Sequence, residues 1–481
     1  MPLQKISPLQ KARQQYQPRI PALLRDLRNV HFKEITGARK PPEALRKLFP
    51  KTFDLPSYQL VAGKSGGEKL KVGALFSGGQ AAGGHNVIAG LFDAGLDVIG
   101  FLNGPSGLVE NRWMAVKEID SFRNQGGFDL LGSGRTKIET QTQLDSALKT
   151  ALAHNLDGLI IIGGDDSNTN AAILAEYFLA HGCNTRVVGV PKTIDGDLRS
   201  ADIEMSFGFD SACKTYSEII GNIARDALSA KKYYHIIKLM GRSASHIVLE
   251  CALATCPNLA LIGEERRSLE VIVAEIADLI CHRHDAGKDY GVVLIPEGLI
   301  EFVPELSKNL KVEKDPHGNV LLSQIQTEKL VIDLVVKELH SRKFQGKFNF
   351  QEHFLGYEGR ACLPTNFDAN YCYALGLLSA AAVRQKLTGV ICAIQNLHLP
   401  ADQWQLKAVP IVQLMHFEMR TGVEKPVIQK TIVDLKRNPY VYFSRSRKLW
   451  EIEDHYRYPG PIQFYGDPEL TDCGPQSIMM G

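Results

Sequence analysis

Long hydrophobic runs are absent from this 481-residue sequence, and so is an excess of charge of either sign. No apolar stretch approaches the roughly 18 residues that a membrane-spanning helix needs, and the opening MPLQKISPLQKARQQ lacks the apolar core of a signal peptide. Lys and Arg number 55 against 53 Asp and Glu, which argues against a surface dedicated to nucleic acid or anionic membrane. We therefore expect a cytoplasmic protein that binds neither.

Paired cysteine motifs are also missing. The nine cysteines contain no CxxC pair, and their odd number fits reduced, mostly buried thiols better than a disulfide framework. Hydrophobic residues at 44% and charged residues at 22% are ordinary for a globular chain. At about 150 residues per domain, the length allows three domains or two larger α/β domains.

What the sequence does contain is an alternation of short apolar runs and amphipathic segments that begins at Lys71. Residues 71–76 predict a buried strand, a glycine loop follows, residues 86–95 predict a helix, and residues 97–102 predict the next strand. The same pattern recurs over residues 156–191. This order predicts a mainly parallel sheet with helices on both faces and with ligands at the carboxyl ends of its strands.

A second α/β series follows Phe207, so the expected fold is α/β with two doubly wound, Rossmann-like domains. We expect an N-terminal, partly helical extension over residues 1–68, a first α/β domain that begins at residue 69 and a second that begins at residue 207. A polar, largely helical insertion that contains the turn KDPHGN is expected near residues 300–354.

Two glycine-rich turns follow predicted strands, at residues 78–79 and 163–164. Each turn exposes backbone N–H groups at a helix start, a geometry that favours phosphate, although glycine also simply ends strands. Asp165 follows the second turn. Because a carboxylate repels phosphate unless a cation intervenes, Asp165 indicates a Mg²⁺ site; the alternative is that it caps a helix that starts near Ser167.

The next strand ends in PKTIDGD, which places a cation, a hydroxyl and two carboxylates within residues 191–197. Two nearby carboxylates can have different pKa values, which leaves one of them as a base for a sugar hydroxyl. Lys192 would neutralise phosphate charge. A plain Asp-Gly-Asp turn is the alternative.

In order, the motifs SGGQAAGG, GGDDSN, PKTIDGD, KYYHIIKLMGR, PEG, GYEGR and YRYPGPIQFYG make the chain from about Lys71 to Phe464 resemble the phosphofructokinase family, in its long pyrophosphate-dependent branch. The resemblance implies fructose 6-phosphate and pyrophosphate as substrates and Mg²⁺ as cofactor. It also implies a donor-binding domain over residues 69–206 and about 361–430, and an acceptor-binding domain over residues 207–360 and about 431–481. It also implies reversible phosphoryl transfer to the sugar C1 hydroxyl, which gives fructose 1,6-bisphosphate and phosphate in glycolysis or gluconeogenesis.

The resemblance also implies roles for individual residues. Asp195 would be the catalytic base, Arg135 would bridge donor and acceptor phosphates, Asp165 would engage Mg²⁺, and Gly79 would approach the donor. The implied catalytic set also includes Thr193 and Asp197. The implied substrate-binding residues are Thr193, Ile194, Asp195, Lys232, Tyr233, Met240, Gly241, Arg242, Glu297, Tyr357, Glu358, Gly359 and Arg360. Lys232 and Tyr233 match a family segment that reaches a neighbouring subunit, so a homodimer or larger oligomer with shared sites is expected.

Donor choice depends on two positions. ATP-dependent members of the family resemble this chain but carry glycine where it has Asp166 and Lys192. The Asp166 side chain would occupy room that a nucleotide needs, while Lys192 can hold a compact diphosphate. Two alternatives are an ATP-dependent 6-phosphofructokinase and a non-catalytic, sugar-phosphate-binding regulatory subunit, and the intact TIDGD, GGDD, MGR and GYEGR motifs argue against the second.

Overall fold

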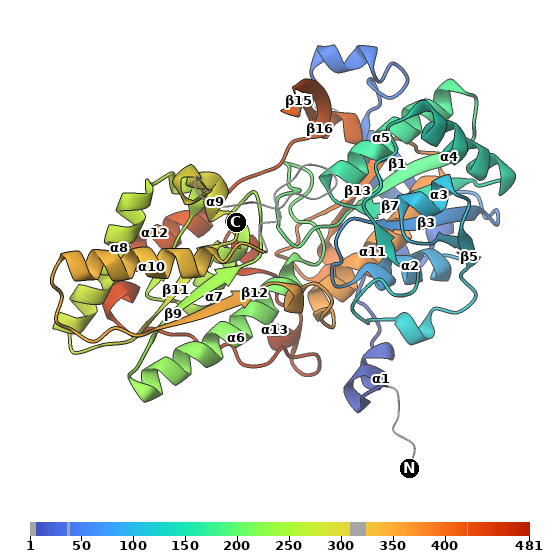
Figure 1. The fold of residues 1–481 in the computed structure, drawn as a ribbon. Helices are drawn as coiled ribbons and strands as arrows, with labels where there is room; N and C mark the ends of the chain where they lie inside the picture. Colours follow the sequence, from blue (N-terminus) through green and yellow to red (C-terminus); the bar gives the residue numbers. More distant parts are fainter. Residues whose placement is uncertain (1–5, 36–38, 308–323, 421) are drawn as a thin grey trace.

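The computed structural model describes residues 6–35, 39–307, 324–420 and 422–481, and its strands form two main sheets with helices packed on them (Figure 1). The expected turn KDPHGN lies outside these residues. Within them, no helix combines the length and apolar character needed to cross a bilayer. All nine cysteines are free thiols, as expected.

The larger sheet has ten strands in the order β1-β2-β14-β13-β8-β7-β3-β4-β5, with β6 paired to β3. The central strands from β13 to β4 are parallel, whereas β1, β2, β14 and β5 pair in antiparallel fashion at the two ends. The strands span Val30–Ile35 (β1), Ser57–Ala62 (β2), Lys71–Ser77 (β3), Asp97–Phe101 (β4), Trp113–Ala115 (β5), Ser133–Gly134 (β6), Gly158–Gly163 (β7), Arg186–Pro191 (β8), Val390–Gln395 (β13) and Gln405–Pro410 (β14).

The N-terminal segment is more closely integrated than the sequence indicated. It begins with helix α1 (Pro8–Gln14), but the helical spacing further on yields only single 3₁₀ turns, such as Ala22–Arg25 and Glu43–Lys47. Between and after these turns, β1 and β2 extend the larger sheet, because β2 pairs with β14 and β1 pairs with β2. The free edge of β14 offers backbone hydrogen bonds that local helical spacing cannot match, so tertiary pairing decides the structure here.

Alternate side chains of the buried strands face opposite helix layers of the larger sheet. Ile160 and Ile162 of β7 pack in the cluster that contains helices α2 (Gly84–Asp93) and α11 (Asn366–Arg384). Leu159 and Ile161 pack in the cluster on the other face, which contains α4 (Gln141–Ala153) and α5 (Asp165–Ala180). This period of two confirms the expected doubly wound arrangement.

The smaller sheet has four parallel strands in the order β10-β11-β9-β12. They span Tyr234–Leu239 (β9), Leu259–Ala260 (β10), Gly291–Pro296 (β11) and Phe350–Leu355 (β12). Helices α6 (Phe209–Ala230) and α7 (His246–Thr255) belong to the cluster on one face, and α8 (Leu269–Asp285) and α10 (Thr327–Ser341) pack near the other. The expected helical insertion thus contains α10 and β12, an integral edge strand.

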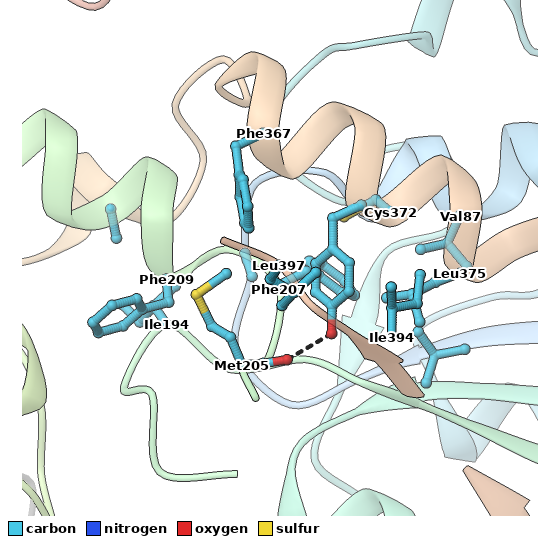
Figure 2. Close-up of a cluster of buried hydrophobic side chains, with 14 of the residues drawn as sticks. Val87, Ile194, Met205, Phe207, Phe209, Phe367, Cys372, Leu375, Ile394 and Leu397 are labelled. Carbon is cyan, nitrogen blue, oxygen red and sulfur yellow. Dashed lines mark hydrogen bonds between the residues drawn. The ribbon is translucent and has the colours of Figure 1, made fainter. Parts of the chain in front are cut away.

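A continuous apolar core joins the two sheets. Figure 2 shows Ile194, from the loop after β8, in one buried cluster with Phe207, Phe209 and Phe367. The hydroxyl of Tyr371 donates to the Met205 carbonyl at 2.6 Å within the same cluster. The loop that carries the TIDGD motif is therefore anchored by burial of Ile194, which is only 6% exposed.

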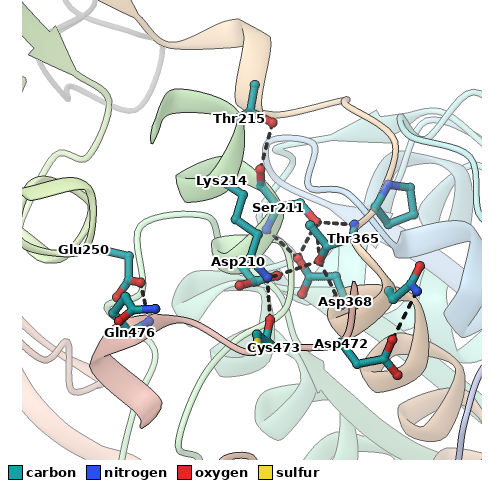
Figure 3. A network of polar contacts seen from close by, with 12 residues as sticks. Asp210, Ser211, Lys214, Thr215, Glu250, Thr365, Asp368, Asp472, Cys473 and Gln476 are labelled. Atoms are coloured by element: carbon teal, nitrogen blue, oxygen red, sulfur yellow. Dashed lines mark hydrogen bonds and ion pairs between the residues drawn. The ribbon is translucent and has the colours of Figure 1, made fainter. Parts of the chain in front are cut away.

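A buried polar network joins the starts of α6 and α11 (Figure 3). The Asp368 carboxylate accepts hydrogen bonds from the backbone N–H groups of Gly208 and Ser211 and from the Ser211 hydroxyl, at 3.1, 2.9 and 2.6 Å. The Thr365 hydroxyl donates to Asp210 at 2.6 Å. These hydrogen bonds fix the starts of the two helices to each other.

The remaining elements lie at the periphery. They are α3 (Pro105–Val109), α9 (Leu299–Phe302), α12 (Asn438–Ile452), α13 (Pro468–Thr471), α14 (Gln476–Met479) and the hairpin of β15 (Met415–Arg420) and β16 (Val423–Ile428). The chain runs from β16 across to α12, and so from the larger sheet to the smaller one (Figure 1).

Candidate active site

A cavity of about 370 Å³ lies between the carboxyl ends of the two sheets. The loops after β3, β7 and β8 line it on one side, and the loops after β9, β11 and β12 line it on the other. This is the edge at which open α/β sheets bind ligands. The predicted residues that line it are Gly79, Arg135, Asp165, Asp166, Lys192, Thr193, Ile194, Asp195, Asp197, Met240, Arg242, Glu297, Tyr357 and Arg360.

Helix α5 begins at Asp165, two residues earlier than the sequence indicated, and its N-cap is Gly164. Asp165 and Asp166 therefore lie in the first turn, where the helix dipole stabilises carboxylates. The alternative expectation that Asp165 caps this helix is wrong. Lys137 Nζ lies 3.5 Å from Asp166 Oδ1. The Oδ2 atom of Asp165 is buried without a hydrogen-bond partner, as expected of an atom kept for a cation.

Lys192 is nearly buried beside the first glycine loop. Its ammonium donates to the Gly79 carbonyl at 2.8 Å, and only 5% of the residue is exposed. Burial, together with repulsion from Arg360 and Arg135, lowers the pKa of Lys192 to about 8. A cation in this state is held in place by the loop and has lost much of its hydration, so an anion in the cavity would bind it strongly.

The TIDGD loop brings two carboxylates to the floor of the cavity. The backbone N–H of Asp195 donates to Thr193 Oγ1 at 3.1 Å, which fixes the turn. Burial raises the pKa of Asp195, against the opposing effect of Lys430, Arg242 and Lys192. Burial and the charge of Asp195 raise the pKa of Asp197 to about 7. Carboxyls with raised pKa values can accept a proton near neutral pH.

The opposite wall carries groups suited to a sugar phosphate. The Gly241 N–H donates to Glu297 Oε2 at 3.2 Å, and burial together with the charge of Asp195 raises the pKa of Glu297 to about 7. The Arg360 guanidinium lies 5.2 Å from the centre of the Tyr357 ring. Tyr357 is 60% exposed at the rim. A guanidinium beside a phenol matches a phosphate monoester.

Cations slightly outnumber carboxylates in the lining. The cations are Arg135, Lys137, Lys192, Arg242, Arg360 and Lys430, and the carboxylates are Asp165, Asp166, Asp195, Asp197 and Glu297. This mixture suits two anionic substrates that must approach each other beside a base, because the cations screen the repulsion between phosphates.

Three predicted binding residues support the cavity without lining it. Gly241 orients Glu297, as described above. Glu358 Oε2 accepts from the Gly356 N–H at 2.7 Å and so shapes the turn before Arg360. Gly359 packs so closely on Tyr216 that a Cβ atom there would lie 2.6 Å from its ring.

Lys232 and Tyr233 do not reach the cavity of their own chain. Both are exposed and precede β9, whereas the cavity lies at the carboxyl end of that strand. Six strand residues span about 20 Å, which is beyond the reach of either side chain. The backbone at Tyr233 has a φ of 69°, a left-handed conformation that is uncommon for a residue other than glycine.

Sequence reasoning missed several lining residues, including Gln80, Lys137 and Lys430. Gln80 lies within the SGGQAAGG motif and Lys137 is two residues after Arg135, so proximity to Gly79 and Arg135 could have found them. Lys430 belongs to no motif. Burial opposes its charge, but Asp165 and Asp197 attract it, and together with Asp195 and Asp166 these carboxylates raise the pKa of Lys430 to about 12.

The protein residues do not form a closed metal cage. Among the described residues, no group of three or more His, Cys, Asp or Glu side chains is arranged to hold an ion. The buried Oδ2 atom of Asp165, which accepts no hydrogen bond, nonetheless fits a divalent cation whose remaining ligands come from phosphate and water, as is usual for Mg²⁺.

Comparisons with known proteins match this chain to the same family over most of its length. The family model described as Phosphofructokinase matches residues 71–383, more than half of the chain. The pyrophosphate--fructose 6-phosphate 1-phosphotransferase of Treponema pallidum is 44% identical, covering 97% of this chain and 96% of its own. The enzyme of the same name from Entamoeba histolytica is 42% identical, covering 99% of both chains.

Solved structures agree on the fold. A pyrophosphate-dependent phosphofructokinase from Nitrosospira multiformis superposes with a TM-score of 0.60 at 18% identity, covering 84% of this chain and 96% of that one. The Pichia pastoris phosphofructokinase superposes with a TM-score of 0.57 at 20% identity, covering 73% of this chain and 36% of that one.

Proposed function

Since this chain belongs to the phosphofructokinase family, we propose that it transfers a phosphoryl group from pyrophosphate to the C1 hydroxyl of fructose 6-phosphate. The products are fructose 1,6-bisphosphate and phosphate, and the reaction is reversible. The observation that carries this proposal is the position of Asp195, in a cavity that is also lined by Lys192, Gly79, Glu297 and Arg360.

Fructose 6-phosphate binds on the side of the smaller sheet. Arg360, Arg242 and Tyr357 hold its 6-phosphate, and Met240 and Glu297 contact the sugar. This places the C1 hydroxyl toward the TIDGD loop. A guanidinium pair gives directional hydrogen bonds to phosphate oxygens, so the anchor sets the orientation of the whole sugar.

Asp195 acts as the base. Its carboxylate takes the proton of the C1 hydroxyl as that oxygen forms a bond to the distal phosphorus, and the bond from this phosphorus to the bridging oxygen breaks to release phosphate. Arg135 and Lys192 neutralise charge on the phosphate oxygens as it redistributes. Thr193 holds the backbone of Asp195 in place through its hydroxyl.

Mg²⁺ is the proposed cofactor, and Asp165 is the residue that would hold it together with the diphosphate. When bound, this ion supplies electrostatic stabilisation of the phosphate oxygens. Asp166 and Lys192 set donor choice. Asp166 occupies space beside the diphosphate at the start of α5, and Lys192 provides a point charge that matches the compact donor.

We propose a homodimer or larger assembly in the cytoplasm, with active sites completed between subunits. The support is the resemblance of the KYYHIIKLMGR segment to the family, together with the position of Lys232 and Tyr233, which lie exposed at the amino end of β9 and away from the cavity of their own chain.

Product analysis tests the function. The protein is incubated with fructose 6-phosphate, Mg²⁺ and pyrophosphate, and ³¹P NMR follows the appearance of fructose 1,6-bisphosphate and phosphate; the reverse reaction starts from these products. We expect both directions to proceed, with phosphate at C1. Hydrolysis of pyrophosphate without a new sugar ester would refute the proposal.

A further inference from the structure

The segment after β16 crosses between the sheets and passes beside the cavity. We call residues 429–433 the strap. The backbone N–H and hydroxyl of Thr431 both donate to the Asp197 carbonyl, at 2.8 and 3.0 Å. The Val433 N–H donates to Glu264 at 2.9 Å, and His246 Nε2 lies 3.2 Å from the Thr431 carbonyl. The strap is therefore held at a defined position against the catalytic loop.

The strap delivers the ammonium group of Lys430 between two carboxylates from different loops. Lys430 Nζ lies 3.7 Å from Asp165 Oδ2 and 3.7 Å from Asp197 Oδ2. It also lies 3.3 Å from the Ser243 hydroxyl. Both carboxylate contacts are ion pairs that are too long for hydrogen bonds, so the ammonium balances the two charges without being tightly bound to either.

Building on the proposed function, we propose that the Lys430 ammonium occupies the position between Asp165 and Asp197 until a divalent cation arrives there with the diphosphate. In the free enzyme, a divalent cation that entered alone would lie beside the Lys430 ammonium and be repelled by it. A diphosphate supplies anionic oxygens that attract the ammonium away from the carboxylates, so the metal and the donor enter together.

The side chain of Lys430 is suited to this movement. It is 38% exposed and carries its charge on a flexible four-carbon stem, while the strap backbone is fixed through Thr431 and Val433. The ammonium can therefore turn toward phosphate oxygens without disturbing the strap. Lys430 is a donor-site residue on this account, and its contribution is lost when its charge is removed.

Metal affinity of the free enzyme tests the proposal. Electron paramagnetic resonance measures Mn²⁺ binding, without diphosphate, to the wild type, Lys430→Met, Lys430→Gln and Lys430→Arg. The neutral variants should bind Mn²⁺ at least about tenfold more tightly, because the repelling charge is gone, and Lys430→Arg should behave as the wild type. Lys425→Met is the matched control. Lys425 lies on β16, pairs with Glu139 at 3.3 Å and has a side chain that is 42% exposed.

Diphosphate affinity is the second readout. Calorimetry measures binding of methylenediphosphonate with Mg²⁺, and the neutral Lys430 variants should bind it about tenfold more weakly, while Lys425→Met does not change. Unchanged or weaker Mn²⁺ binding in the neutral variants, or unchanged diphosphonate binding, overturns the role of Lys430. A wild type that binds both probes yet transfers no phosphoryl group from pyrophosphate would instead overturn the proposed function.

Discussion

At the scale of single residues, the site depends on how burial adjusts charge. The same cavity raises the pKa of Asp195, raises those of Asp197 and Glu297 to about 7, and lowers that of Lys192 to about 8. Acids and bases are thus both close to their titration points near neutral pH. Desolvation disfavours each charged form, and the neighbouring charges then decide how far each group shifts.

Replacing the proposed base separates chemistry from binding. Asp195→Ala should lower kcat by about 10²- to 10⁴-fold while the affinity for fructose 6-phosphate changes little, because a base acts mainly in the transition state. Steady-state kinetics and calorimetry measure the two quantities. Asp202→Ala is the control, since Asp202 pairs with Lys407 at 2.9 Å outside the cavity lining. Near-normal turnover of Asp195→Ala would remove Asp195 from the mechanism.

The pH profile should be bell-shaped. Asp197 and Glu297 take up a proton as pH falls through about 7, and Lys192 loses its charge as pH rises through about 8. Activity therefore declines on both sides, with an optimum between these values. In Lys192→Arg the guanidinium stays charged, so the alkaline decline should move to higher pH. An alkaline limb in the same place in kcat/KM profiles of both enzymes would exclude Lys192 as its cause.

At the scale of elements, much of the structure was predictable because alternation and glycine loops are local signals. The strands β3, β4, β7 and β8 and the helices α2 and α5 follow the predicted pattern closely, whereas α3, α4, β5 and β6 were not predicted. The pairing of β2 with β14, to which β1 adds a further strand, was not predictable, since a free sheet edge more than 300 residues away decides it. Lys430 was missed for the same reason, because only the fold brings the strap to the TIDGD loop.

The contact between α2 and α11 gives a stability prediction at this scale. A Cβ atom on Gly376 would lie 2.2 Å from the Val87 carbonyl oxygen and 3.0 Å from Gly90 Cα, both of them backbone atoms. Helix propensity alone would make alanine about 1 kcal/mol better than glycine. Overpacking against backbone costs about 1–3 kcal/mol, so Gly376→Ala should be destabilising overall.

Thermal unfolding measures this effect. Gly376→Ala should lower Tm, whereas Gly67→Ala, where nothing lies within 4 Å of the added atom, should leave it unchanged. A raised Tm for Gly376→Ala would mean that the two helices can separate at little cost.

At the scale of the whole molecule, the two parallel sheets present their carboxyl ends to one cavity, and a single apolar core runs between them. On the proposed function, the donor would bind to loops of the larger sheet and the acceptor to loops of the smaller one. Such a division would let two anionic substrates be held by separate loops and still meet at Asp195. The exposed amino end of β9 is the part that we propose contributes to a second copy of the chain.

Subunit complementation tests shared sites. Lys232→Ala and Asp195→Ala should each be inactive alone, but mixed chains should regain activity, because a hybrid contains one site in which both residues are intact. Activity is measured after subunit exchange has been demonstrated with differently tagged chains. Mixtures that exchange subunits and stay inactive would show that each site is complete within one chain.

Donor preference tests the central claim most directly. The measurement is kcat/KM with pyrophosphate and with ATP, for the wild type and for the double variant Asp166→Gly, Lys192→Gly. The wild type should use pyrophosphate strongly in preference to ATP, and the double variant should shift the ratio toward ATP by more than about tenfold, or about 1.4 kcal/mol. A wild type that uses ATP and not pyrophosphate, or a ratio that both substitutions leave unchanged, would contradict the account.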